Sequence, residues 1–141
     1  MIVICGEYNS GKTHKVVELL DFSKQILYFS LDFDKRIKAI ELKLPNIRVE
    51  GFYRKPCLND LESIILQYGG FLSNKLNTIV IDPINYLNFD KKSIKYKLSK
   101  IKELENKYNN QFNIIITLNK LHHFEMEDIE ISDYDSFFTI S

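Results

Sequence analysis

Residues 6–13 have the residue types and the spacing of a phosphate-binding loop. They fill every fixed position of the pattern Gly, four free residues, Gly, Lys and then Ser or Thr. Gly6 and Gly11 lack a Cβ, so the backbone at these positions can adopt positive φ and approach a phosphate closely. The pattern therefore predicts a site for the phosphates of a nucleoside triphosphate, which we take to be ATP.

Each remaining residue of this loop has a separate expected role. The backbone N–H groups from about Asn9 to Thr13, including those of Ser10 and Gly11, would point at β-phosphate oxygens, and the dipole of a following helix would favour the negative charge. Lys12 would contact the β- and γ-phosphates. The hydroxyl of Thr13 would bind a Mg²⁺ ion that keeps most of its water ligands. The loop therefore predicts ATP and Mg²⁺ as the bound species.

A phosphate loop needs a strand before it and a helix after it, and the sequence supplies both. Residues 1–5 are an apolar run of strand length, and the apolar residues among 16–20 fit one side of a helix. Further strands are expected at 25–31, 47–52, 78–82, 112–118 and 137–140, and further helices at about 35–44, 60–68 and 91–108. This alternation predicts an α/β three-layer sandwich with a mainly parallel sheet of about five strands.

The expected helix ends depend on local capping residues. Asn59 or Asp60 is a plausible N-cap for the helix that follows, and Gly69-Gly70 would close that helix. Asp90 would cap the long helix that runs to Tyr108.

Asp82 ends the apolar run that begins at Thr78. In an open α/β sheet, ligands bind beyond the carboxyl ends of the strands, which places Asp82 at the same edge as the phosphate loop. There it would hold Mg²⁺ through water. The alternative is an aspartate that only opens the turn at Pro83, but a phosphate loop in the same chain favours the metal role.

Two other strand ends carry candidate site residues. Asp32 and Asp34 follow the strand at 25–31, and either could orient the water that attacks the γ-phosphate, or could instead cap the next helix. Asn119 and Lys120 follow the strand at 112–118, where either could contact the γ-phosphate or lie in a solvated loop. Both alternatives remain open from the sequence.

Size and composition predict one domain covering residues 1–141. The chain has 19 basic and 19 acidic residues, so its total charge favours neither a nucleic-acid nor a membrane surface. Cys5 and Cys57 are too few to indicate disulfides or a zinc site. No leader precedes the first strand and no apolar run reaches the length of a membrane span, so we expect a cytoplasmic protein without a membrane partner.

With these residues assembled, the chain resembles the RecA-like P-loop ATPase core, and most closely the motor domain of DnaB-type replicative helicases. The resemblance covers nearly the whole chain, through the phosphate loop and through residues 28–32, 80–87 and 116–123. It implies that Asp32 takes the position of the catalytic glutamate of the family. It also implies that Lys120 stands where the family has glutamine.

The departures from this family concern the speed of hydrolysis. The base position carries Asp32 in place of glutamate, and no arginine follows Arg54, so the usual C-terminal arginine that reaches a neighbouring subunit is missing. We therefore predict slow intrinsic ATP hydrolysis that a partner stimulates. His122 and His123 have no third ligand at metal spacing and are interpreted as loop residues.

The resemblance implies a role in DNA replication or recombination, with single-stranded DNA or a DNA-processing protein as partner and self-association into a homo-oligomer. The acidic stretch 124–130 opposes DNA binding. A basic alternative is the helix with Lys91, Lys92, Lys95, Lys97, Lys100 and Lys102, although such lysines are more often a solvated helix face. Two other functions remain open, namely a nucleoside or nucleotide kinase and a nucleotide-gated assembly protein that does not hydrolyse ATP.

Overall fold

The computed structural model describes residues 1–72, 76–90, 93–108, 111–120 and 129–140. Their strands form one six-stranded sheet in which all pairs are parallel, in the order β3-β2-β4-β5-β1-β6. The strands are β1 (Ile2–Gly6), β2 (Gln25–Ser30), β3 (Ile47–Glu50), β4 (Leu76–Asp82), β5 (Asn113–Asn119) and β6 (Ser136–Ile140). The helices are α1 (Lys12–Leu19), α2 (Lys35–Lys43), α3 (Leu58–Leu72) and α4 (Ile94–Lys107).

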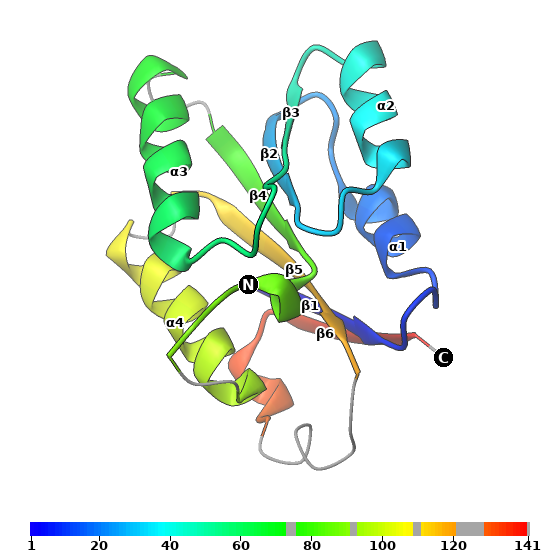
Figure 1. Cartoon of the computed structure of the whole chain (residues 1–141), viewed down its shortest axis with the longest axis vertical. Coiled ribbons are helices and arrows are strands. Elements are labelled where there is room, and N and C mark those ends of the chain that lie inside the picture. Colours follow the sequence, from blue (N-terminus) through cyan, green and yellow to red (C-terminus); the bar gives the residue numbers. More distant parts are fainter. Residues whose placement is uncertain (73–75, 91–92, 109–110, 121–128, 141) are drawn as a thin grey trace.

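The helices cover the two faces of the sheet in pairs. Helices α1 and α2 lie on one face and α3 and α4 on the other (Figure 1). Each face has its own cluster of buried apolar side chains, one containing Phe29, Leu61 and Leu98 and the other containing Ile4, Val16 and Tyr28. The strands are apolar on both faces because both are buried. The expected α/β three-layer fold is confirmed, with six strands in the sheet.

Three of the expected helix ends were wrong. Ser93, and not Asp90, caps α4, because its hydroxyl accepts a hydrogen bond from the backbone N–H of Tyr96 at 3.1 Å. Helix α3 begins at Leu58, and the carboxylate of Asp60 accepts from the N–H of Cys57 at 2.9 Å, from inside the first turn. Helix α3 also runs past Gly69-Gly70 to Leu72.

The carboxyl ends of the central strands meet at one edge of the sheet, where the phosphate loop begins. Strand β1 lies between β5 and β6, so Gly6 is opposite Asn119 on one side and Ile140 on the other. Strand β4 lies beside β2, with Asp82 opposite Ser30. The sheet thereby brings residues from both halves of the chain to the start of the loop.

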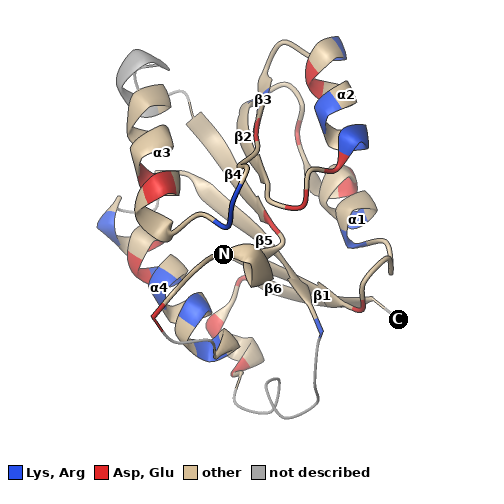
Figure 2. Ribbon diagram, viewed as in Figure 1, with Lys and Arg blue, Asp and Glu red and all other residues tan. Residues whose placement is uncertain are grey.

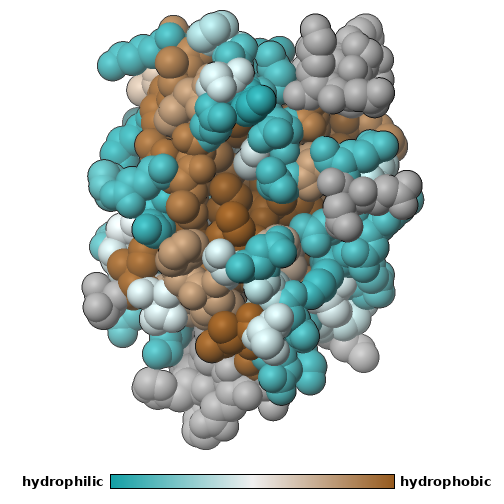
Figure 3. Space-filling model, turned by 180° about the vertical axis from the view of Figure 1, so that it is seen from behind, coloured by the Kyte–Doolittle hydropathy of each residue, from teal (hydrophilic) through white to brown (hydrophobic). Residues whose placement is uncertain are grey.

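The view from behind shows apolar surface on the half of the molecule that carries α1 and α2. Brown residues form a band there (Figure 3). Leu42 is 83% exposed, and Phe22, Leu44 and Phe138 are only partly buried against the cluster under these helices. None of these four residues lines the cavity of the site described next.

Candidate nucleotide-binding site

The backbone of the loop turns through the left-handed region at two positions. Asn9 has φ 61° and Gly11 has φ 96°, and Gly11 is the N-cap of α1. Asparagine tolerates this region better than most residues, and glycine adopts it at no steric cost. Between them the N–H of Ser10 donates to the carbonyl oxygen of Glu7 at 3.1 Å. The loop is therefore folded into a tight turn that leads directly into the helix.

Gly6 is required by the close approach of the loop to β6. A Cβ at this position would lie 2.8 Å from the carbonyl oxygen of Ile140 and 2.4 Å from Oγ of Ser10. The Oγ of Ser10 is itself buried and has no hydrogen-bond partner among the described residues. A buried hydroxyl without a partner is costly, so a phosphate oxygen bound in this loop would supply the missing bond. The loop therefore fits the phosphates of a nucleotide.

A cavity of about 300 Å³ opens in front of this loop. It brings together most of the residues that the sequence predicted, because they lie at the ends of β2, β4 and β5 or in the loop. Its lining consists of Tyr8, Asn9, Ser10, Gly11, Lys12, Thr13, His14, Asp32, Arg36, Asp82 and Asn119.

Lys12 is the cation inside the loop. Its side chain is only 6% exposed, and its Nζ donates to the carbonyl oxygen of Glu7 at 2.5 Å. Burial lowers the pKa of the Lys12 ammonium, and the nearby carboxylate of Asp82 opposes this shift. A phosphate would replace a neutral carbonyl with an anion as the partner of a buried ammonium, which is the stronger interaction.

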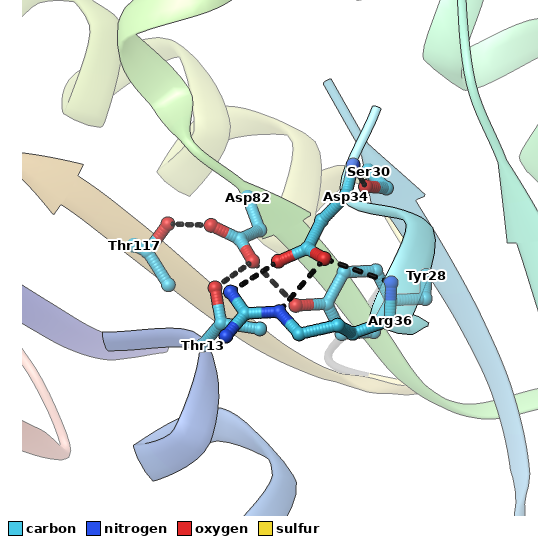
Figure 4. Close-up of polar contacts among 7 residues, drawn as sticks. All are labelled: Thr13, Tyr28, Ser30, Asp34, Arg36, Asp82 and Thr117. Carbon is cyan, nitrogen blue, oxygen red and sulfur yellow. Dashed lines mark hydrogen bonds and ion pairs between the residues drawn. The ribbon is translucent and has the colours of Figure 1, made fainter. Parts of the chain in front are cut away.

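Asp82 is buried and accepts hydrogen bonds from three hydroxyl groups. Its Oδ2 accepts from Thr13 at 2.9 Å and from Tyr28, and its Oδ1 accepts from Thr117 at 2.5 Å (Figure 4). Burial and then the charge of Asp82 raise the pKa of Tyr28 well above its usual value, so the phenol keeps its proton. These donors hold the carboxylate in one orientation at the base of the cavity.

Thr13 and Asp82 are suitable for holding Mg²⁺. A hydroxyl that donates its proton to Asp82 keeps its oxygen lone pairs for a cation. Mg²⁺ is usually bound by one or two protein oxygens together with substrate phosphates and water. No group of three or more His, Cys, Asp and Glu side chains is suitable for a metal in the part of the chain that the structure describes. Any Mg²⁺ here would therefore need the phosphates of the nucleotide.

Asp32 and Asp34 have different surroundings although they are two residues apart. Asp32 lines the cavity, and partial loss of water around its carboxylate, with the charge of Asp82, raises its pKa. Asp34 is the N-cap of α2 and forms two further hydrogen bonds with the Arg36 side chain, at 2.8 and 3.1 Å. These contacts lower the pKa of Asp34. The capping alternative therefore describes Asp34, and Asp32 is left as the candidate base.

Asn119 lines the cavity and its backbone is held by Asn85. Oδ1 of Asn85 accepts from the N–H of Asn119 at 2.7 Å, and its Nδ2 donates to the carbonyl oxygen of Asn119 at 3.0 Å. The next residue, Lys120, donates its backbone N–H to the carbonyl oxygen of Gly6 at 2.9 Å. Lys120 is not among the residues lining the cavity, so the geometry favours Asn119 as the phosphate contact.

Three residues at or next to the cavity were not predicted as site residues. Tyr28 and Thr117 are polar side chains in the apolar middle of β2 and β5. Each is two residues from a position whose side chain packs in the cluster under α1 and α2. The alternation of side chains along a strand could have placed Thr117 on the face of the phosphate loop. Arg36 lines the cavity from α2 (Figure 4). Its place depends on how α2 packs, which no local pattern shows.

Several sequence predictions fall on residues outside the described part of the chain. These are His122, His123, Lys91, Lys92 and most of the acidic stretch 124–130. Among the described lysines of α4, Lys97 is 8% exposed and donates to the carbonyl oxygen of Asn85, Lys100 pairs with Glu103, and Lys102 donates to the carbonyl oxygen of Asp133. Lys97 is therefore buried and fits neither alternative, whereas the contacts of Lys100 and Lys102 favour the solvated helix face over a DNA-binding surface. Across the described helices, none combines the length and the apolar character that crossing a bilayer demands.

Comparison with known proteins supports the fold. No family model matches the sequence, and no curated protein matches it. A solved structure that it does resemble is a KaiC-like protein from the hyperthermophilic archaeon Pyrococcus horikoshii OT3, with a TM-score of 0.53 and 14% identity over 90% of this chain. The chain spans 65% of the length of that protein. The likeness shows a shared fold, whereas membership of the RecA-like ATPases and the closer resemblance to DnaB-type helicases remain predictions.

Proposed function

We propose that this protein binds and slowly hydrolyses ATP, and that it acts in DNA replication or recombination in the cytoplasm. The observation that carries the proposal is the single cavity that residues 8–13 of the phosphate loop line together with Asp82 and Asp32. Lys12 and the loop backbone bind the β- and γ-phosphates in this scheme. Arg36 supplies a second cation from α2, and Asn119 contacts the γ-phosphate from β5.

Hydrolysis requires a water molecule aimed at the γ-phosphate and a group that accepts its proton. Asp32 is the carboxylate in the cavity wall that serves this role, because Asp34 is held by Arg36 and by the start of α2. Asp32 is one methylene shorter than the glutamate of the family, which supports a slow intrinsic rate. Thr13 and Asp82 would hold Mg²⁺, which neutralises the charge that develops on the phosphates.

Turnover with different additives tests the proposed function. We expect slow release of phosphate from ATP and Mg²⁺ that increases when single-stranded DNA is added at low salt, because the proposed partner stimulates hydrolysis. The measurement is ADP and phosphate formation with DNA, with nucleosides or with neither. ADP formed only with a nucleoside or nucleoside monophosphate would instead indicate a kinase. Tight ATP binding without turnover, together with nucleotide-dependent oligomerisation, would indicate an assembly protein.

The pH dependence of hydrolysis should report on Asp32. A base must be ionised, so the rate should fall as the pH is lowered through the pKa of Asp32, which lies above the ordinary value for aspartate. Replacing Asp32 with Asn should slow hydrolysis roughly a hundredfold and remove this acidic limb. The pH–rate profile of Asp34→Asn is the control, because asparagine also caps helices well. An acidic limb that persists in Asp32→Asn would show that another group is the base.

A further inference from the structure

Beside the nucleotide cavity, two exposed aromatic side chains line a separate groove. Tyr53 is fully exposed and Phe33 is 55% exposed, and their ring centroids are 6.2 Å apart with 40° between the ring planes. Both rings border a groove of about 400 Å³ between the β2–α2 turn and the segment after β3. Together the two rings form a contiguous exposed patch beside polar residues, and such patches can mark ligand-binding grooves.

The backbone fixes the position of the Phe33 ring. Phe33 has φ 55°, an unusual conformation for a bulky residue, which turns its side chain toward β3. The ring then packs over Gly51, where an added Cβ would lie 3.1 Å from Cε1 of Phe33. The absence of a side chain at Gly51 therefore makes room for the ring. The Phe33 ring is therefore held in place before any ligand binds.

Cationic side chains line the α2 side of this groove. Lys35 and Lys38 line it from α2, and Arg54 and Lys55 follow Tyr53 directly. Figure 2 shows these basic positions on α2 and on the segment after β3, on either side of the β2–α2 turn. Asp34 of the lining pairs with Arg36, and Lys38 pairs with Glu41, so Lys35 is the lining residue whose charge is left for a ligand among the described residues. The groove therefore suits an anionic partner.

We propose that this groove binds single-stranded nucleic acid, with one base stacked on Tyr53 and Phe33 and the neighbouring phosphates beside Lys35 and Arg54. Aromatic faces and flanking cations together are the features that bind single strands without sequence preference. A nucleic-acid duplex would keep its bases stacked inside the helix, where such rings could not reach them. This proposal relies on the proposed function for one point only, namely that the single strand is the partner that stimulates ATP hydrolysis.

The groove is connected to Asp32, the proposed base, through a single peptide bond. Phe33 follows Asp32 directly, and the N–H of Asp34 donates to Oγ of Ser30 at 3.2 Å, so this turn is short and closely held. Ser30 also lines the groove, and it is opposite Asp82 in the sheet. A base stacked on Phe33 would therefore act on the backbone that positions Asp32. Binding at the groove and hydrolysis in the cavity should be coupled.

The test is binding of a fluorescein-labelled thymidine oligonucleotide of about 20 nucleotides, followed by anisotropy at about 50 mM salt. We expect Tyr53→Ala to bind about tenfold more weakly and Lys35→Gln to lower the salt slope by about 0.7. The matched controls are Leu42→Ala, an exposed apolar position of α2, and Lys43→Gln, an exposed lysine of the same helix. Both controls should bind as the unaltered protein does.

Three results would overturn the inference. They are no oligonucleotide binding by the unaltered protein, unchanged binding by Tyr53→Ala, and displacement of the oligonucleotide by polyglutamate at equal charge concentration, which would indicate an acidic-peptide site. Tyr53→Ala should also keep its basal ATP turnover and lose the stimulation by DNA. ATP binding by Tyr53→Ala is measured separately. A groove that does not bind the oligonucleotide can therefore be distinguished from failure of the proposed ATP-dependent function.

Discussion

Replacing Lys12 with Ala should weaken ATP binding roughly 10- to 100-fold, because it removes a charge-assisted hydrogen bond to the phosphates from a buried position. Hydrolysis should fall further, by about a thousandfold, since the charge on the phosphates grows in the transition state. The measurements are ATP affinity by calorimetry and single-turnover hydrolysis.

The Lys12 variant should remain folded, which makes its loss of function interpretable. Burial already lowers the pKa of the Lys12 ammonium, so the folded protein pays a desolvation cost for this charge without bound phosphate. Removing it should leave the melting temperature unchanged or slightly higher. Lys15→Ala is the matched control on the same helix, because Lys15 packs over the Phe138 ring and not in the cavity. Equal ATP affinity in both variants would contradict a phosphate-binding role for Lys12.

Asp82→Asn should remove the dependence of ATP hydrolysis on Mg²⁺ and slow hydrolysis by about a hundredfold or more. Binding of ATP without Mg²⁺ should be unchanged or tighter, because a negative charge next to the phosphates is lost. Slower hydrolysis together with unchanged or tighter ATP binding without Mg²⁺ is expected for a residue that holds the metal, and not for a residue that only supports the fold. The measurement is ATP affinity and turnover as functions of Mg²⁺ concentration.

Controls for Asp82 are available in its own hydrogen-bond network. Thr117→Val and Tyr28→Phe each remove one hydroxyl donor to the carboxylate and leave its charge in place. Both should lower activity less than Asp82→Asn does. An unchanged Mg²⁺ response in Asp82→Asn would rule out its assignment as a metal-holding residue.

The sequence predicted the parts of the site that local chemistry determines. The phosphate loop is a contiguous pattern, and Asp82 ends an apolar strand, so neither prediction needs knowledge of packing. The order of strands and helices followed from the same reasoning. The α/β fold was predicted because apolar strand segments alternate with helical segments along the chain.

Helix ends were harder to predict where the sequence offers two competing local solutions. Asp90 and Ser93 are both good N-caps, and the structure uses Ser93. Two glycines in a helix cost about 1 kcal/mol each, which is too little to end α3 when Leu61 and Ile65 anchor it in the core. Arg36 was visible in the sequence, but its place at the cavity depends on the packing of α2 against β3 and the sheet.

The position of β1 in the sheet has a consequence for the synthesis of this protein. The loop that follows β1 is synthesised well before β5 and β6, the two neighbours of β1 in the sheet. These pairings join residues more than a hundred positions apart, and such contacts form slowly. Nascent chains should therefore carry the phosphate pattern long before they can hold a nucleotide. ATP binding would then distinguish fully folded molecules from partly folded ones during refolding.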